Sequence, residues 1–148
     1  MFMPHWPKPI SNKSFAQTDL KPLEILLKYL RGPHLSMGSN IIHIAGTNGK
    51  GSTSAYLASI MNQAGYKCHI YTSPHLIRFN ERIKICGEEI EDDYLFYLLE
   101  KIRIVTEQYN LTNSFFQIIT AAAFLAFAEN KSDLIILETG IGGRLDAT

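Results

Sequence analysis

A run of eight residues in the first third of the chain has the composition of a phosphate-binding loop. It consists of Gly46, Thr47, Asn48, Gly49, Lys50, Gly51, Ser52 and Thr53. Closely spaced glycines let backbone N–H groups turn inward around phosphate oxygens, and a helix starting after the loop adds the positive end of its dipole. Lys50 could reach the β- and γ-phosphates, and Ser52 or Thr53 could offer a hydroxyl to Mg²⁺. The run therefore predicts a site for ATP and Mg²⁺, with Lys50 as its catalytic residue.

The same residues allow a simpler interpretation, because Asn-Gly is a common signal for a tight hairpin turn. A turn explains neither Lys50 nor the strand-like and helix-like segments on either side, so we favour the phosphate loop. Its spacing is unusual. In the common form GxxxxGK[ST] the first glycine lies two residues further from the lysine, and here Gly51 separates Lys50 from Ser52.

A second candidate is Glu138, which ends the apolar run 133–137 and precedes a glycine-rich loop. A carboxylate at the carboxyl end of a strand beside a phosphate loop can hold Mg²⁺ on the β- and γ-phosphates. The alternative is a solvent-exposed glutamate at a strand end, since most glutamates are exposed. The phosphate loop upstream favours the metal ligand.

Three segments together resemble the Mur ligase superfamily, and in particular folylpolyglutamate synthase/dihydrofolate synthase. They are GTNGKGS at 46–52, YTSPHLIRFNERI at 71–83 and ETGIGGRLDAT at 138–148. On residue type alone, Ser73 before Pro74 is an ordinary turn residue. The resemblance implies instead that Ser73 ligates Mg²⁺, together with Ser52 and Glu138.

The reaction that this resemblance implies is an ATP-dependent ligation in folate biosynthesis and polyglutamylation. In the family, ATP phosphorylates the carboxylate of dihydropteroate or a (tetrahydro)folate, and the amine of L-glutamate attacks the acyl phosphate to form an amide. Family positions near the pterin correspond here to Ser114, Phe115, Phe116, Gln117, Leu145, Asp146 and Ala147. For the two phenylalanines, packing in the core at a helix start is an equally good interpretation of the sequence.

The resemblance covers about residues 41–148 and corresponds to only the first third or so of a complete enzyme. We therefore expect residues 1–148 to form a partial ATP-binding domain without the carboxy-terminal domain, whose groups could come from a separate chain. One alternative is a catalytically inactive remnant that at most binds nucleotide. Another is a different P-loop ATPase or kinase, which the 71–83 and 138–148 segments disfavour.

Composition limits the other functions open to the chain. It has 148 residues, 46% of them apolar, and equal numbers of acidic and basic residues, 14 each. This predicts one globular domain with no field that recruits nucleic acid or a membrane surface. No apolar run approaches the ~20 residues of a membrane span, and no signal peptide is evident. Cys68 and Cys86 are expected as buried thiols in a reducing cytoplasm, and the five histidines lack zinc-ligand spacing.

The site residues must be positioned by alternating strands and helices. Strands are predicted at 40–45, 67–72, 82–86 with a short return at 88–90, and 133–137; helices at 20–30, 52–64, from 91 to about 105, and 117–128. The helix at 117–128 is apolar nearly all round, which favours burial against a sheet. The pattern predicts an α/β fold with a P-loop NTPase-like, mainly parallel sheet flanked by helices, as in the Mur ligase central domain but truncated. Parallel neighbours should bring Ser73 and Glu138 close to Lys50.

Overall fold

The protein is described by a computed structural model that covers residues 19–38 and 40–148. Its centre is a five-stranded sheet in the order β1-β5-β2-β3-β4. The strands are β1 (Ile41–Ile44), β2 (Cys68–Tyr71), β3 (Ile83–Ile85), β4 (Glu88–Glu89) and β5 (Leu134–Glu138). The helices are α1 (Lys21–Tyr29), α2 (Pro33–Ser36), α3 (Lys50–Gln63), α4 (Asp92–Gln108) and α5 (Phe115–Glu129), with a 3₁₀ turn, η1, at Phe79–Arg82.

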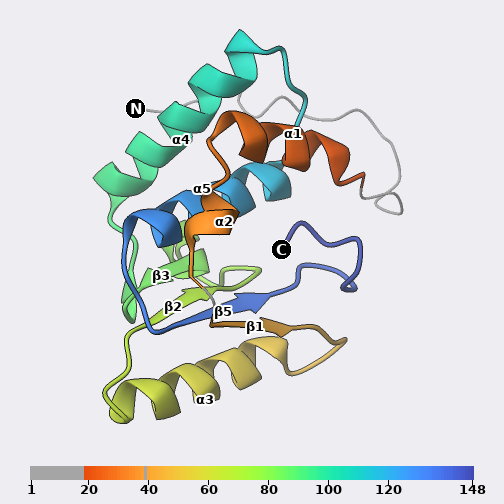
Figure 1. The fold of residues 1–148 in the computed structure, drawn as a ribbon. Helices are drawn as coiled ribbons and strands as arrows, with labels where there is room; N and C mark the ends of the chain where they lie inside the picture. The colour runs from red at the N-terminus through yellow and green to blue at the C-terminus, as the bar shows by residue number, and fades with distance from the viewer. Residues whose placement is uncertain (1–18, 39) are drawn as a thin grey trace.

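Strand β5 lies between β1 and β2 and runs parallel to both. In this register Glu138 pairs with Ile44, just before the glycine-rich loop, while Leu137 pairs with Tyr71, two residues before Ser73. The carboxyl ends of the three strands therefore meet at one edge of the sheet. The loop after β1 and the loop after β5 lie on the same side of the molecule (Figure 1). The predicted placement of Glu138 beside the loop 46–53 is confirmed.

The hairpin β3–β4 adds two antiparallel strands beyond β2, as the sequence predicts. Its turn is Cys86-Gly87, and both residues have positive φ angles, 51° and 94°. The prediction that both cysteines are buried is wrong for Cys86. Cys68 is buried in β2, whereas Cys86 is exposed because it occupies the turn rather than the strand.

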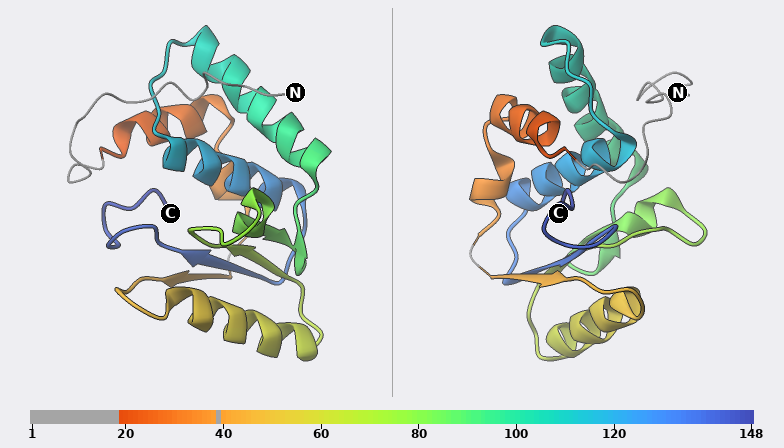
Figure 2. Two further views of the ribbon diagram at one scale, coloured as in Figure 1. Left: turned by 180° about the vertical axis from the view of Figure 1, so that it is seen from behind. Right: turned by 90° about the vertical axis from the view of Figure 1, so that its right-hand side faces the viewer.

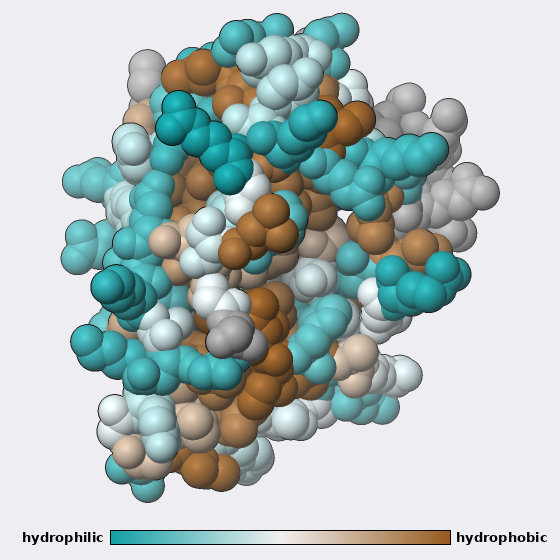
Figure 3. Space-filling model, in the orientation of Figure 1, coloured by the Kyte–Doolittle hydropathy of each residue, from teal (hydrophilic) through white to brown (hydrophobic). Residues whose placement is uncertain are grey.

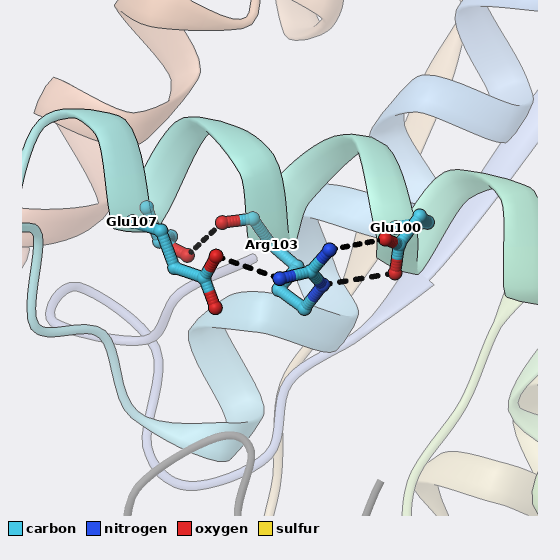
Figure 4. A network of polar contacts seen from close by, with 4 residues as sticks. Glu100, Arg103 and Glu107 are labelled. Atoms are coloured by element: carbon cyan, nitrogen blue, oxygen red, sulfur yellow. Dashed lines mark hydrogen bonds and ion pairs between the residues drawn. The ribbon is translucent and has the colours of Figure 1, made fainter.

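Helices cover the two faces of the sheet unequally. Helix α3 packs alone on one face, and α5 lies on the other, with α1, α2 and α4 packed around it (Figures 1 and 2). Helix α5 is buried along most of its length, as expected for a helix that is apolar nearly all round. Helix α4 buries Leu95, Leu98 and Ile102. Its outer side carries Arg103, paired with Glu100 and Glu107 (Figure 4).

The edge strand β1 is less covered than its sequence suggests. Ile41 and Ile42 are 41% and 38% exposed, although both are apolar residues of a predicted strand. Figure 3 shows apolar surface over this region. No strand within residues 19–38 and 40–148 pairs with the outer edge of β1, so its side chains lack the cover that β5 receives from two neighbours.

Two local features differ from the sequence prediction. Helix α3 begins at Lys50 rather than Ser52, because Gly49 adopts the left-handed conformation (φ 78°) and the helix starts directly after it. The segment 73–81, for which neither a helix nor a strand is predicted, ends in the turn η1. In addition, the short helix α2 starts directly after Gly32, two residues beyond the predicted end of the first helix at residue 30.

Candidate active site

The loop after β1 leads into the start of α3, where no side chain caps the first backbone N–H groups. Gly49 is the N-cap of α3 and has no side chain, so no side-chain oxygen accepts from the first N–H groups of this 14-residue helix. The first N–H groups of a helix have no partner within it. Together with the helix dipole, they make this end of α3 suited to a phosphate.

Side chains of the loop divide into those already bonded and those still available. Lys50 Nζ donates to the Gly46 carbonyl at 2.9 Å, which folds the ammonium back over the loop. Thr53 Oγ1 donates to the Gly49 carbonyl at 2.8 Å, so this hydroxyl supports the helix start. Ser52 is exposed in the first turn, and it is the better placed of the two hydroxyls to reach a cation. Thr47 and Asn48 are exposed at the loop tip.

Glu138 is a buried carboxylate aimed at this loop. It is 4% exposed, and Ser73 donates its backbone N–H to Oε2 at 3.3 Å. A Cβ placed on Gly51 would lie 3.9 Å from the same oxygen, so the carboxylate faces the start of α3. Burial raises the pKa of Glu138, while the Ser73 N–H and the Lys50 ammonium partly oppose the rise.

These residues fit a magnesium ion bound together with a nucleotide. No group of three or more His, Cys, Asp and Glu side chains gathers within residues 19–38 and 40–148, so a site made by protein ligands alone is not available there. Mg²⁺ usually takes one or two carboxylates and fills its shell with waters and phosphate oxygens. Glu138, with the hydroxyl-bearing Ser52 and Ser73 nearby, is such a donor set. A buried carboxylate with a single, long hydrogen bond would also gain from a cation.

The segment after β2 is held in shape by one carboxylate that the sequence analysis did not single out. Glu81 accepts three backbone hydrogen bonds, from Leu76, Ile77 and Arg78, at 2.7–2.9 Å. These donors hold the pKa of Glu81 below its usual range. Glu81 follows its three donors by only three to five residues, and this short spacing is the signal by which the sequence could have indicated the closed loop. The result is a fixed loop that carries Ser73 at its start.

The loop after β5 is closed by Asp146. Its carboxylate accepts from the backbone N–H of Ile141 at 2.8 Å and from both the N–H and the hydroxyl of Thr148. Thr148 Oγ1 also bonds His43 Nε2 of β1 at 2.8 Å. Asp146 and Ala147 are buried, whereas Leu145 is 46% exposed. Of the three residues predicted to contact the pterin here, Leu145 is therefore the most accessible.

The four predicted substrate residues at the start of α5 serve different structural purposes. Ser114 and Gln117 form a capping box, in which each side chain accepts from the other's backbone N–H, and Gln117 also donates to the Asp19 carbonyl. The ring of Phe116 packs against Gly140 of the loop after β5. Phe115 is 47% exposed and stacks edge-on with Phe79, 6.0 Å between ring centroids. Only Phe115 presents a large open surface, so a substrate role for the group stays a prediction.

Comparison with known proteins gives consistent sequence relatives, although no protein-family model matches the chain. It is 46% identical over 111 residues to the dihydrofolate synthase/folylpolyglutamate synthase of Bacillus subtilis. The aligned region makes up 72% of this chain and 26% of that protein. The protein of the same name from Escherichia coli is 41% identical over 108 residues, 73% of this chain and 25% of its own length. The chain thus spans about a quarter of the curated relatives that it matches.

Solved structures agree with the sequence relatives. E. coli FolC in complex with DHPP and ADP superposes with a TM-score of 0.82 at 34% identity, over 93% of this chain and 32% of that one. A bifunctional folylpolyglutamate synthase/dihydrofolate synthase with Mn, AMPPNP and L-glutamate bound gives 0.80 at 33% identity, over 89% and 32%. None of the helices in the described part of the present chain has the length and apolar character of a membrane span. The mixed α/β fold and the predicted resemblance are confirmed: over a quarter to a third of their length, this chain is a homologue of the dihydrofolate synthase/folylpolyglutamate synthase enzymes.

Proposed function

We propose that residues 1–148 form a partial ATP- and Mg²⁺-binding domain of an ATP-dependent ligase that adds L-glutamate to dihydropteroate or a (tetrahydro)folate. The observation that carries this proposal is the convergence of Lys50, Ser73 and Glu138 at the carboxyl ends of β1, β2 and β5. In open α/β sheets this is the edge at which ligands bind.

Each residue has a definite task in this proposal. The free N–H groups at the start of α3 and the Lys50 ammonium bind the β- and γ-phosphates, for which Lys50 must exchange the Gly46 carbonyl for a phosphate oxygen. Glu138, Ser73 and Ser52 hold the cation. Bound Mg²⁺ supplies charge neutralisation on the phosphate oxygens. Since phosphoryl transfer depends mainly on positioning and charge stabilisation, these groups address its largest requirement.

Two relatives suggest the ligands that the site accepts. One was solved with DHPP and ADP, the other with Mn, AMPPNP and L-glutamate. For the present chain we accordingly propose ATP with a divalent cation, Mg²⁺ by preference because its harder shell suits oxygen donors. The acid substrate is dihydropteroate or a folate, with Ser114, Phe115, Phe116, Gln117, Leu145, Asp146 and Ala147 lining its pocket. The work of such an enzyme lies in the cytoplasm, where ATP is supplied, and involves neither nucleic acid nor a membrane.

A second candidate is a nucleotide-binding protein without ligase activity. It is favoured by one observation, namely that the groups gathered at this sheet edge, Lys50 and Glu138 among them, all serve the nucleotide and its cation. Both candidates share the ATP site, so they separate only when turnover is measured alongside binding.

The experiment is titration calorimetry of MgATP into the purified chain and into Lys50→Ala. We expect at least about tenfold weaker binding by the variant, because a charge-assisted hydrogen bond to phosphate is lost. Lys28→Ala, which removes an exposed lysine of α1, is the matched control and should bind like the parent. If the parent chain does not bind MgATP, or if Lys50→Ala binds it equally well, the proposed ATP site is wrong.

A further inference from the structure

A buried arginine beside the candidate active site has no anionic partner in the described part of the chain. Arg82 is 9% exposed. Its Nε donates to His75 Nδ1 at 2.9 Å, and its guanidinium carbon lies 5.6 Å from the ring centroid of Phe79 and 5.9 Å from that of Phe115. Within residues 19–38 and 40–148, its two Nη groups form no hydrogen bond and no ion pair.

This arrangement leaves the fork of the guanidinium open while fixing its plane. The flat face of an arginine stacks well on aromatic rings, and its two Nη groups bind a carboxylate through two parallel hydrogen bonds. Holding a positive charge at this depth is costly unless an anion compensates it. The two phenylalanines and His75 therefore present Arg82 as a preformed site for a planar anion.

The position of Arg82 relates it to the reacting end of the proposed substrate. Its carbonyl accepts the N–H of Thr72, so its backbone lies next to Ser73, whose own N–H bonds Glu138. On its other side, the guanidinium faces Phe115, which starts α5 and has the exposed ring. Arg82 thus lies between the proposed cation site and the proposed pterin site, where an acid substrate must place its carboxylate to meet the γ-phosphate.

One other charged side chain, Asp146, lies close enough to be considered as a partner of Arg82. The Tyr71 hydroxyl of β2 is buried against Thr120 of α5, and both Arg82 and Asp146 act on its pKa, in opposite directions. Asp146 forms no ion pair with Arg82, and its carboxylate accepts three hydrogen bonds from its own loop. Within the described residues, the positive charge of Arg82 therefore has no ion-pair partner.

We propose that Arg82 binds the carboxylate of the acid substrate, with Phe79 and Phe115 holding the guanidinium in plane. This inference rests on the proposed function, since it names the group in that same site that recognises the reacting acid. It also assigns a selectivity: the site should distinguish pterins that carry the carboxylate from those that lack it.

The test compares two ligands that share the pterin ring. Dihydropteroate carries one carboxylate, and 6-hydroxymethyl-7,8-dihydropterin carries none. We expect Arg82→Ala to weaken dihydropteroate binding by at least about tenfold, and to change binding of the hydroxymethylpterin by less than about twofold. Arg82→Lys should lie between the two, because it keeps the charge and loses the planar fork.

Three controls separate recognition from folding. Arg78→Ala removes a charge from the same segment, but this arginine is exposed and faces Asp92 at 3.8 Å, so both ligands should bind as in the parent. Arg82→Gln keeps an N–H for His75, and it replaces the alanine variant if thermal melting shows that variant unfolded. MgATP binding, measured in parallel, should be retained in Arg82→Ala and lost in Lys50→Ala.

An equal loss of both ligands would overturn the proposal, since it would make Arg82 a support of the aromatic cluster. Unchanged binding of dihydropteroate would overturn it as well. Failure of the parent chain to bind dihydropteroate would do the same, yet with MgATP binding intact it would leave the proposed ATP site standing. The two proposals therefore fail separately.

Discussion

Glu138 illustrates how a residue that suits a cation can cost stability when the cation is absent. The side chain is buried at the end of β5 with one hydrogen bond at 3.3 Å, and burial raises its pKa. A carboxyl group with a raised pKa in the folded state stabilises that state most when protonated. Its contribution is therefore fully present below about pH 4.5, the ordinary value, and is lost as the pH rises through the folded-state pKa.

We predict that Glu138→Gln raises the melting temperature of the ligand-free chain at pH 7 and weakens MgATP binding. The amide removes the cost of a buried charge, and about 1 kcal/mol corresponds to roughly 2–4 °C in a domain of this size. Thermal melting and calorimetry check the two effects. Glu88→Gln, in the exposed strand β4, is the control. A lower melting temperature in Glu138→Gln would show that the carboxylate stabilises the fold instead.

Position 140 requires glycine because the ring of Phe116 lies very close to its backbone. A Cβ at this position would lie 2.7 Å from Cζ of Phe116, a distance that real Cβ atoms do not reach. We predict that Gly140→Ala destabilises the chain by about 1–3 kcal/mol, as overpacking in a tight site does. Gly143→Ala is the matched control in the same loop, because its Cβ would meet Ala45 at an ordinary 3.8 Å.

Denaturant unfolding measures both variants, and the double variant Gly140→Ala/Phe116→Ala tests the cause. Removing the ring should make the added methyl group nearly neutral relative to Phe116→Ala alone. If the alanine at 140 costs the same with and without the ring, then the Phe116 contact does not explain the glycine.

At the scale of elements, His69 joins three of them through one neutral imidazole. It lies in β2, donates from Nε2 to the Asn130 carbonyl after α5 at 3.0 Å, and accepts the Cys86 N–H of the hairpin turn on Nδ1 at 3.1 Å. The ring stacks on Phe127 at 5.0 Å. Burial lowers the pKa of His69, so the folded state prefers the neutral form.

We predict a corresponding acid sensitivity. Because the folded-state pKa is depressed, the stability that His69 contributes is present above about pH 6.5 and is lost as the pH falls toward the folded-state pKa. One proton changes the free energy of unfolding by at most about 1.4 kcal/mol per pH unit. Denaturant unfolding between pH 7.5 and 5.5 measures the slope, and His69→Gln should flatten it. An unchanged slope in that variant would assign the sensitivity to other groups.

The elements also show which features the sequence could predict. The positions of the loop 46–53 and of Glu138 were predictable because both belong to short motifs at the ends of apolar strands. The contacts of His69 and Gln117 were not, since their partners lie 61 and 98 residues away. The exposure of Ile41 and Ile42 was hidden for a similar reason: an apolar strand looks the same at the edge of a sheet and at its centre.

At the scale of the whole molecule, the groups proposed to bind ATP and its cation lie at one edge of a sheet whose first strand leaves apolar side chains exposed. About three quarters of the length of these relatives lies outside the matched region. Binding the nucleotide needs only the groups on this sheet edge. Ligation also requires groups that hold L-glutamate and stabilise the transition state. Binding ATP equally tightly in the ground state and in the transition state does not accelerate that chemistry.

We predict that a polypeptide of residues 1–148 binds MgATP but does not add L-glutamate to dihydropteroate or tetrahydrofolate at an appreciable rate. Release of ADP in the presence of both acceptor and glutamate measures the ligation, with a full-length dihydrofolate synthase/folylpolyglutamate synthase as the positive control and Lys50→Ala as the control for binding. Turnover comparable to that of the full-length enzyme would mean that the sheet edge described here holds every group that the reaction needs. Binding that Lys50→Ala abolishes, without turnover, would instead mean that the remaining catalytic groups must come from additional polypeptide.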